Sequence, residues 1–197
     1  PTNALAATWY RAVQLRFWRS LLAVSHTAII PGRFNAGNVS RPGFEVLYFA
    51  EDHVTALFEV EALLGSPYPG STYIPNPNTA WTVVNVDLQV GRVAGLTTVA
   101  NRKTIGTTVQ ELTGDWRGYV LRNSNARLKA PYWTQAPTQR LGHALHGVRG
   151  LEGFITYSAR IPTRKILVVF PGKLRPGSRL LFVNPVTGKA DEVNPPS

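Results

Sequence analysis

Six short runs of the chain combine branched and aromatic side chains with flanking turn residues, a pattern typical of β-strands. They cover residues 8–13, 44–50, 80–88, 154–157, 166–170 and 179–183. The run at 80–88 alternates apolar and polar residues in its middle, as expected of a strand with one buried face. The run at 44–50 is apolar and aromatic for most of its length, which predicts a buried strand.

Apolar residues at helical spacing predict helices between these strands. Residues 14–24 carry apolar and basic side chains at that spacing. Residues 51–64 predict a helix of about 14 residues, whose first two residues are acidic, as the helix dipole favours, and which stops at Gly65. A third helix is expected over 138–149, and the last five residues are expected to be a frayed end.

Loops rich in Pro, Gly and Asn separate these elements, notably at 31–43 and 66–79, and residues 89–125 have a mixed pattern. Strands and helices are mixed without the regular β-α-β alternation of a doubly wound fold. We therefore expect an α+β fold with a strongly bent, mostly antiparallel sheet and flanking helices. One domain is expected over 1–197, with its core at about 9–183.

The charge of the chain narrows the choice of partners. Lys and Arg number 21 against 11 acidic residues, which gives a net charge of +10. Nucleic acid, an anionic small molecule or an acidic protein would each fit that charge. The basic residues are scattered from Arg11 to Lys189 without a dense tract. A solvated surface with a phosphate-binding cleft is therefore favoured over dedicated nucleic-acid binding.

The sequence lacks the features that mark several classes of protein. No apolar run approaches the ~20 residues of a membrane-spanning helix, and the first residues lack the basic-then-apolar order of a signal peptide. The absence of Cys excludes disulfides, a thiol nucleophile and Cys-based zinc sites. His143 and His146 are three residues apart, but without nearby carboxylates a solvated helix face is favoured and no metal site is predicted.

Two candidate binding residues lie in or beside the second strand. Arg33 follows a Gly in a tight loop, and its planar guanidinium could donate two parallel hydrogen bonds to a pyrophosphate. Tyr48 could stack on a flat ring while its hydroxyl contacts a sugar or phosphate. Taken singly, a solvated loop Arg and a core Tyr are the more ordinary interpretations.

The candidates for charge stabilisation lie further on. At 100° per residue, Glu59 falls on one helical stripe with Asp52 and Thr55, and that stripe is either solvated or faces a cleft. In a cleft, Glu59 would supply negative charge to a developing cation. Glu61 falls among the apolar positions and stays a competing candidate. Ser158 follows a strand and, without a base, is not a hydrolase nucleophile, although it could orient a substrate group.

The order and spacing of these segments resemble the RES domain, a family named for its Arg, Glu and Ser. The eleven-residue step from Tyr48 to Glu59 matches the strand-then-helix spacing of that family. The chain has PGRFN where the family commonly has GGRWN, and its loop from Arg33 to Tyr48 is a few residues longer. The matching segments are YRA at 10–12, GRFN at 32–35, VLYFAE at 46–51, ALFE at 56–59, LTGDW at 112–116, QRLGHALH at 139–146 and GLEGFITYSAR at 150–160.

The resemblance carries expectations about activity and partners. RES domains are the toxins of RES–Xre toxin–antitoxin pairs, are similar in fold to ADP-ribosyltransferases, and cleave the nicotinamide–ribose bond of NAD⁺. NAD⁺ is then the substrate, and neither a further cofactor nor a metal is expected. A cognate Xre-type antitoxin or an immunity protein is the expected partner. The expected site of action is the cytoplasm, and delivery as a secreted effector domain stays open.

The resemblance also assigns residues. Arg33, Tyr48, Glu59 and Ser158 match the functional set of the family, and Arg11 matches a further Arg on its first strand. Nicotinamide departs neutral while positive charge develops on the ribose, so the site must hold the diphosphate and stabilise a cation. Arg33, helped by Arg11, would clamp the diphosphate, Tyr48 would contact the nicotinamide ribose region, Glu59 would stabilise the cation, and Ser158 would position nicotinamide or Glu59.

Three questions stay open at the level of sequence. Water or phosphate could capture the ribosyl cation. The same residues could instead transfer ADP-ribose to a macromolecule. A basic binding module without catalysis is the remaining alternative, and it predicts no NAD⁺ turnover and a steep salt dependence of binding.

Overall fold

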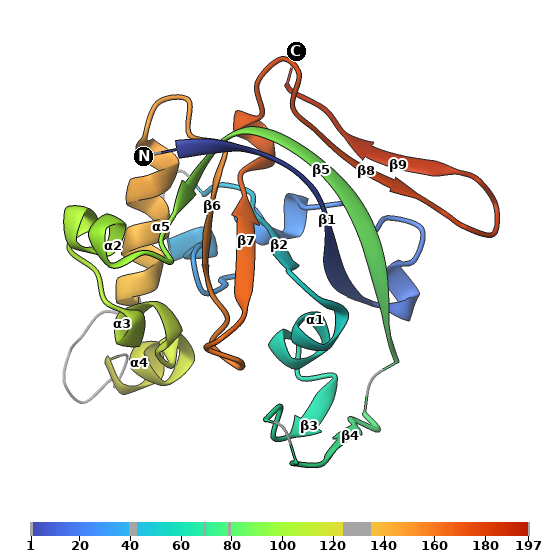
Figure 1. Cartoon of the computed structure of the whole chain (residues 1–197), viewed down its shortest axis with the longest axis horizontal. Helices are drawn as coiled ribbons and strands as arrows, with labels where there is room; N and C mark the ends of the chain where they lie inside the picture. Colours follow the sequence, from blue (N-terminus) through green and yellow to red (C-terminus); the bar gives the residue numbers. More distant parts are fainter. Residues whose placement is uncertain (1, 40–42, 69, 79, 124–134, 197) are drawn as a thin grey trace.

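The computed structural model describes residues 2–39, 43–68, 70–78, 80–123 and 135–196. Within these, one large, strongly bent sheet has the strand order β1-β2-β7-β6-β5-β8-β9, and β1 also pairs with β5 (Figure 1). All pairings are antiparallel except that of β5 with β6. The strands are β1 (Thr2–Gln14), β2 (Leu47–Ala50), β5 (Trp81–Gly95), β6 (Gly153–Tyr157), β7 (Lys165–Val169), β8 (Arg179–Val183) and β9 (Ala190–Val193).

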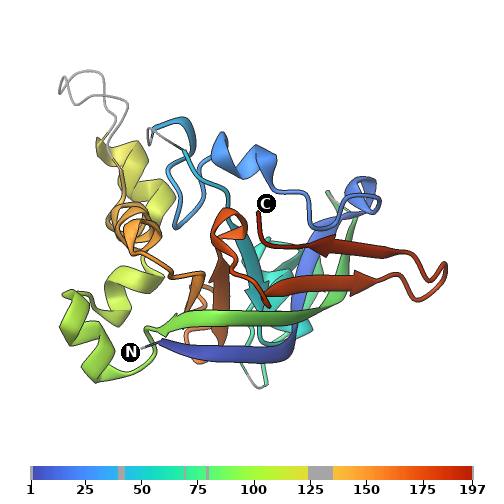
Figure 2. The ribbon, with the colours of Figure 1, turned by 90° about the horizontal axis from the view of Figure 1, so that it is seen from above.

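Each run that the sequence pattern predicted as a strand contains one, which confirms the α+β expectation with its bent, mostly antiparallel sheet. β1 and β5 are longer than predicted because they pair with each other from Thr2↔Ala94 to Gln14↔Trp81. β9 pairs with β8 and was not predicted, and its last residue, Val193, is the first residue of the expected frayed end, which is therefore wrong at that position. Figure 2 shows the β8–β9 hairpin reaching away from the helices.

The two faces of the sheet are covered by two separate clusters of buried side chains. In β2, Leu47 and Phe49 enter one cluster, while Ala50 enters the other. In β7, Leu167 and Val168 divide in the same way. Successive residues of a strand point to opposite faces, so a strand that is covered on both sides is apolar at every position. This packing explains why the segment is apolar or aromatic at every position from Val46 to Ala50.

Helix α1 (His53–Glu59) is half the length that the sequence predicted. Asp52 is its N-cap and accepts a hydrogen bond from the Thr55 amide at 2.8 Å, so the acidic pair precedes the helix instead of forming its first turn. The helix ends at Glu59, and Glu61 has a left-handed φ of 59°. The chain then forms a small hairpin of β3 (Leu63–Gly65) and β4 (Tyr73–Pro75), so the expected helix over 51–64 is wrong beyond residue 59.

The helix expected from the spacing over 14–24 is also wrong. β1 continues to Gln14, and only a 3-10 turn at Leu15–Phe17 follows. A second 3-10 turn covers Ser25–Ala28. The apolar side chains that suggested a helix, Trp18, Leu21, Leu22 and Val24, instead pack against the sheet from an irregular segment.

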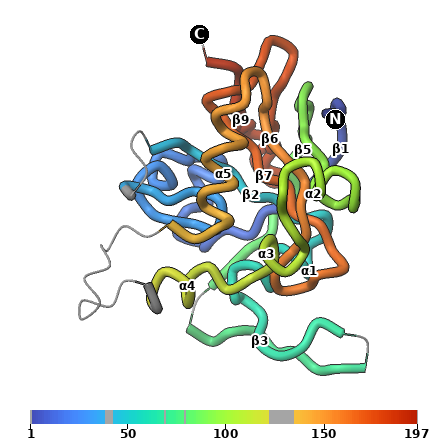
Figure 3. Tube along the Cα trace, turned by 90° about the vertical axis from the view of Figure 1, so that its left-hand side faces the viewer, coloured from blue at the N-terminus to red at the C-terminus, as the bar shows by residue number. Residues whose placement is uncertain are grey.

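Four helices lie along one side of the sheet, the left side in Figure 1 and the near side in Figure 3. Three of them fall in the region of mixed pattern, and two of these begin at Thr98 and Thr108, whose side chains cap the helix. The fourth confirms the helix expected at about 138–149. They are α2 (Val99–Ile105), α3 (Val109–Thr113), α4 (Trp116–Asn123) and α5 (Pro137–Gly147).

β1 and β2 pair at a single position, Tyr10↔Ala50, and diverge beyond it. α1 contacts β1, β2 and β5 beside this divergence. The sheet is therefore split between β1 and β2, with the end of α1 beside the split.

Candidate active site

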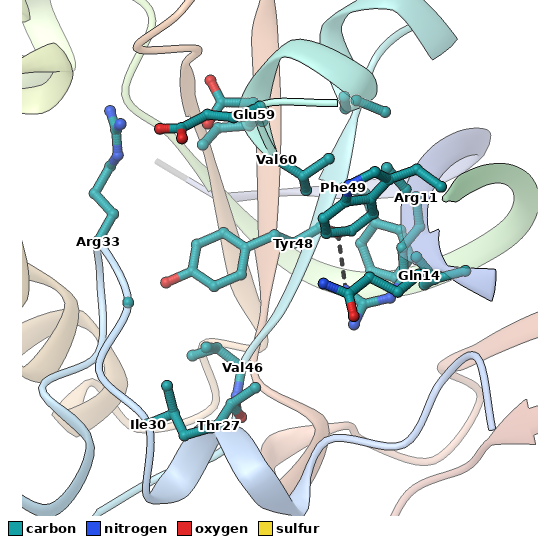
Figure 4. Close-up of a pocket in the computed structure, with 18 of the residues that line it drawn as sticks. Arg11, Gln14, Thr27, Ile30, Arg33, Val46, Tyr48, Phe49, Glu59 and Val60 are labelled. Carbon is teal, nitrogen blue, oxygen red and sulfur yellow. Dashed lines mark hydrogen bonds between the residues drawn. The ribbon is translucent and has the colours of Figure 1, made fainter. Parts of the chain in front are cut away.

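A cavity of about 880 Å³ occupies the split between β1 and β2. Its walls come from β1, β2, the end of α1, the loop around Arg33 and the segments just after α3 and β6. This volume is in the range of pockets that enclose small-molecule ligands. Figure 4 shows Arg33 and Glu59 reaching towards each other across it, with Tyr48 between them and Arg11.

Glu59 is held in place by the segment that follows β6. Its Oε1 accepts a hydrogen bond from the Ser158 hydroxyl, one from the Ala159 amide at 2.9 Å and one from the Arg160 amide at 3.4 Å. Glu59 is half-buried and lines the cavity, so its carboxylate is oriented while it still faces the space a ligand would fill. A carboxylate fixed in this way is suited to stabilise a positive charge.

Ser158 is completely buried and is absent from the cavity wall. Its hydroxyl donates to Glu59 and accepts hydrogen bonds from the Ile161 amide at 2.9 Å and the Arg160 amide at 3.2 Å. Of the two roles expected from the sequence, positioning of nicotinamide or of Glu59, this geometry favours the second. Ser158 therefore orients the Glu59 carboxylate and does not reach the cavity itself.

Arg33 lies on the cavity wall opposite Glu59 and donates to the Leu112 carbonyl at 3.3 Å. Burial lowers the pKa of its guanidinium, whereas the charge of Glu59 acts in the opposite direction. Arg160 and Arg117 also lower the pKa of Arg33, which means that three cations share this end of the cavity. The arrangement is suited to bind an anion such as a diphosphate.

The Tyr48 hydroxyl anchors the loop that carries Arg33. It donates to Asn35 Oδ1 at 2.9 Å and accepts from the Phe34 amide at 3.0 Å. Burial raises the pKa of Tyr48, so its hydroxyl stays protonated. The Asn35 amide nitrogen in turn donates to the Thr27 and Ile30 carbonyls at 2.6 and 3.1 Å.

Asn35 was not singled out as a functional residue in the sequence, although it belongs to the GRFN segment. It is almost completely buried, and so is Gln139 of α5, which donates to the Gly32 carbonyl at 2.9 Å. An Asn two residues after an Arg in a loop with several Gly residues is the signal that could have pointed to this role. The loop around Arg33 is therefore held from β2 and from α5.

Arg11 spans the split between the two strands. Its Nε donates to the Leu21 carbonyl at 3.1 Å, and one terminal nitrogen donates to the Tyr48 carbonyl at 3.2 Å. Burial lowers the pKa of Arg11 to about 10, so it remains charged at neutral pH. These two hydrogen bonds hold β1 against its neighbours, and the other N–H groups of Arg11 are available to a ligand in the cavity.

Glu61 also reaches the cavity wall, but its carboxylate is paired with two arginines. It forms an ion pair with Arg160 and lies 3.7 Å from Arg117, and its side chain is half exposed. Glu59, in contrast, is oriented by a buried hydroxyl and two main-chain amides. Of the two candidates, the geometry favours Glu59 as the carboxylate that faces a ligand.

No group of three or more His, Asp or Glu side chains in the described part of the chain is arranged to hold a metal ion. His146 does not lie on a solvated face. Its ring stacks on Phe44 with centroids 4.2 Å apart and packs edge-on against Phe170. Among the described helices, none has the length and apolar character needed to cross a membrane.

The opening between β1 and β2, with an oriented glutamate opposite an arginine, defines an α+β protein with a cleft lined by a fixed carboxylate and several cations. The model of the RES domain family matches residues 8–184, and the chain belongs to this family. The residues expected from the motifs, Arg33, Tyr48 and Glu59, all line the one cavity, and Ser158 contacts it through Glu59.

A solved structure with a similar fold is the crystal structure of the M. tuberculosis MbcT–MbcA toxin–antitoxin complex. The match has 20% sequence identity and a TM-score of 0.58, and it covers 98% of this chain and 87% of the other. At this identity the likeness concerns the fold. No curated protein matches the chain.

Proposed function

We propose that this protein is an NAD⁺-depleting toxin that cleaves the bond between nicotinamide and ribose. The observation that carries the proposal is the Glu59 carboxylate, held by Ser158 and Ala159 and facing Arg33 across the cavity. NAD⁺ enters as the substrate, and the reaction requires no separate cofactor. The proposed site of action is the cytoplasm, where the NAD⁺ pool is consumed.

The charges of the reaction match the charges of the site. As the C1′–N1 bond breaks, both of its electrons pass to the nicotinamide nitrogen, which leaves neutral, and positive charge develops on the ribose. Glu59 stabilises that cation, because a fixed carboxylate next to a developing positive charge lowers the barrier. Arg33 holds the diphosphate, and Tyr48 holds the loop that carries Arg33. Water or phosphate then forms the new bond to C1′.

The test is the release of nicotinamide from NAD⁺ by the purified protein, with no macromolecule added, followed by chromatography. We expect release at a rate proportional to protein concentration. A parallel reaction with inorganic phosphate distinguishes the acceptor, because phosphorolysis yields ADP-ribose phosphate and hydrolysis yields ADP-ribose. Release only after a protein or nucleic acid is added would favour ADP-ribosyl transfer. The absence of release in every condition would favour a binding module.

An antitoxin is the proposed partner. The family likeness supports it, and the similar fold occurs in a toxin–antitoxin complex. Phe17 and Ile30, both on the cavity wall, and the neighbouring Ile29 are large apolar side chains exposed over half of their surface or more. An antitoxin that covers these residues would bury apolar area and block the cavity. Co-expression with the neighbouring gene should give a complex without NAD⁺ turnover, and separate elution of an active protein would contradict this partner.

A further inference from the structure

The cavity has a second end, away from Glu59, that the proposed catalytic residues do not use. Gln14, Arg16, Phe17 and Trp81 line it. They meet because Gln14 pairs with Trp81 in the β1–β5 ladder, and the Leu15 amide donates to the Ala80 carbonyl at 3.0 Å. This end is thus built from the last residues of β1, the 3-10 turn after it and the first residue of β5.

Phe17 offers an accessible aromatic surface at this end. The residue is 50% exposed even though it lies on the cavity wall. The Arg16 guanidinium lies 4.8 Å from the centre of the Phe17 ring. Aromatic rings and guanidinium planes are the surfaces on which nucleobases stack, whatever the identity of the base.

Trp81 provides an unused hydrogen-bond donor. Its Nε1 is buried and, within the part of the chain that the structure describes, has no hydrogen-bond partner. A buried N–H without an acceptor is unfavourable, and such groups in folded proteins are nearly always paired. Trp81 lines the cavity, so a small shift of the wall as a ligand enters would let an acceptor atom in a flat ring complete this pair.

We propose that this second end binds the adenine base of NAD⁺, with Phe17 and Arg16 as the stacking surface and Trp81 Nε1 as a donor to a purine ring nitrogen. The inference rests on the proposed function, because Glu59 at the first end then takes the nicotinamide ribose. β1 pairs with β2 at Tyr10, and from Tyr10 to Gln14 the strand advances about 13 Å. The cavity therefore separates the two ends by several residues of strand, as a dinucleotide requires, and Arg11 lies between them.

The first experiment measures the binding of AMP by calorimetry. AMP contains the adenine half without the nicotinamide, so its binding does not depend on cleavage. The test variants are Trp81→Phe, which removes the N–H and keeps a ring, and Phe17→Leu, which removes the ring and keeps an apolar side chain. The matched controls, Trp18→Phe and Tyr68→Leu, change residues outside the cavity wall.

We expect the wild type to bind AMP and the dissociation constant to rise about tenfold in each test variant, with little change in the controls. Equal affinity in wild type and test variants would overturn the proposal, and so would a wild type that does not bind AMP. If the wild type binds AMP through these residues but releases no nicotinamide from NAD⁺, the proposed function fails while the adenine site stands.

The second experiment compares NAD⁺ with nicotinamide mononucleotide, which lacks the adenylate. The readout is the ratio of the two kcat/KM values, so a general loss of folded protein cancels. We expect the preference for NAD⁺ to fall about tenfold in Trp81→Phe and in Phe17→Leu. An equal effect on both substrates would overturn the assignment, because the affected residues would then act on the part that the two substrates share.

Discussion

The Glu59 carboxylate is oriented by one hydroxyl and the main chain of the segment after β6, while Glu61, two residues away, is neutralised by arginines. This difference between two nearby acids leaves Glu59 as the one available to the cationic transition state of the proposed reaction. It depends on contacts made across about a hundred residues of chain. The residue-scale predictions follow from these contacts.

Glu59→Gln should lower the rate of nicotinamide release at least a hundredfold, because the amide keeps the shape of the side chain and loses its charge. Removal of one such electrostatic contact raises a barrier by about 3–4 kcal/mol. The control is Glu61→Gln, which disturbs only a half-exposed ion pair and should change the rate by a few-fold at most. If Glu61→Gln is the inactive variant and Glu59→Gln retains full activity, the two assignments must be exchanged.

Ser158→Ala should lower kcat by about tenfold or more and change KM little, because it releases Glu59 without touching the substrate. Ser178→Ala is a matched control, since Ser178 is also buried and donates to a buried glutamate, Glu152, outside the cavity wall. It should lower the melting temperature and leave the kcat of the folded protein near that of the wild type. Equal kcat losses in both variants would argue against a specific role of Ser158.

At the scale of elements, the loop around Arg33 is placed by two neighbours that are distant in sequence. Tyr48 of β2 and Gln139 of α5 hold it by hydrogen bonds. α5 comes so close that a Cβ at Gly142 would lie 1.9 Å from the Phe34 carbonyl oxygen. The position of Arg33 therefore depends on how closely this helix packs.

Gly142→Ala should destabilise the protein by about 1–3 kcal/mol, because the helix or the loop must move to relieve the contact. The displaced loop should also raise the KM for NAD⁺. Gly147→Ala is the control in the same helix, because a Cβ there would have no atom within 4 Å. Chemical denaturation and steady-state kinetics measure the two effects, and equal stability of the two variants would contradict the close approach.

At the scale of the molecule, the bent sheet separates two hydrophobic clusters and leaves a split between β1 and β2 for the cavity. The helices on one side close the cluster that contains Phe44 and Phe170, and His146 of α5 is packed into that boundary. Burial of a titratable ring at such a boundary makes the stability of the whole fold depend on pH.

Burial, together with the charges of Lys173 and His143, lowers the pKa of His146 to about 4. The unfolded chain, with a pKa near the ordinary 6.5, then binds the proton more readily than the folded protein. The contribution of His146 to the free energy of unfolding should be greatest above pH ~6.5 and should decrease as the pH falls towards 4. Denaturant titrations at several pH values across this range give the free energy of unfolding at each pH. This free energy should depend less steeply on pH in His146→Gln than in the wild type, with His53→Gln as the control. A pH dependence of the free energy of unfolding that is unchanged in His146→Gln would contradict this role of His146.

Much of the fold could be predicted from local pattern. The alternation of apolar and polar residues predicted β5, and the largely apolar run at 44–50 predicted β2. Both predictions were possible because the pattern of burial along a strand repeats every two residues and is therefore visible in a short segment. α1 was overpredicted because Leu63 and Leu64 fit a helical stripe and also fit the β3–β4 hairpin that they form. The choice between the two depends on a partner strand ten residues further along.

The amino-acid sequence by itself determined the class of fold, because strand alternation is a local property of the chain, and its motifs singled out Arg33, Tyr48, Glu59 and Ser158 as candidates through their resemblance to the RES domain. Only the tertiary structure decided that Ser158 bonds the Glu59 carboxylate, that Glu61 is paired with Arg160, and that Asn35 and Gln139 hold the Arg33 loop. Each of these depends on a contact between segments that lie apart in the sequence. Such contacts are selected by packing of the whole sheet, which no short segment encodes.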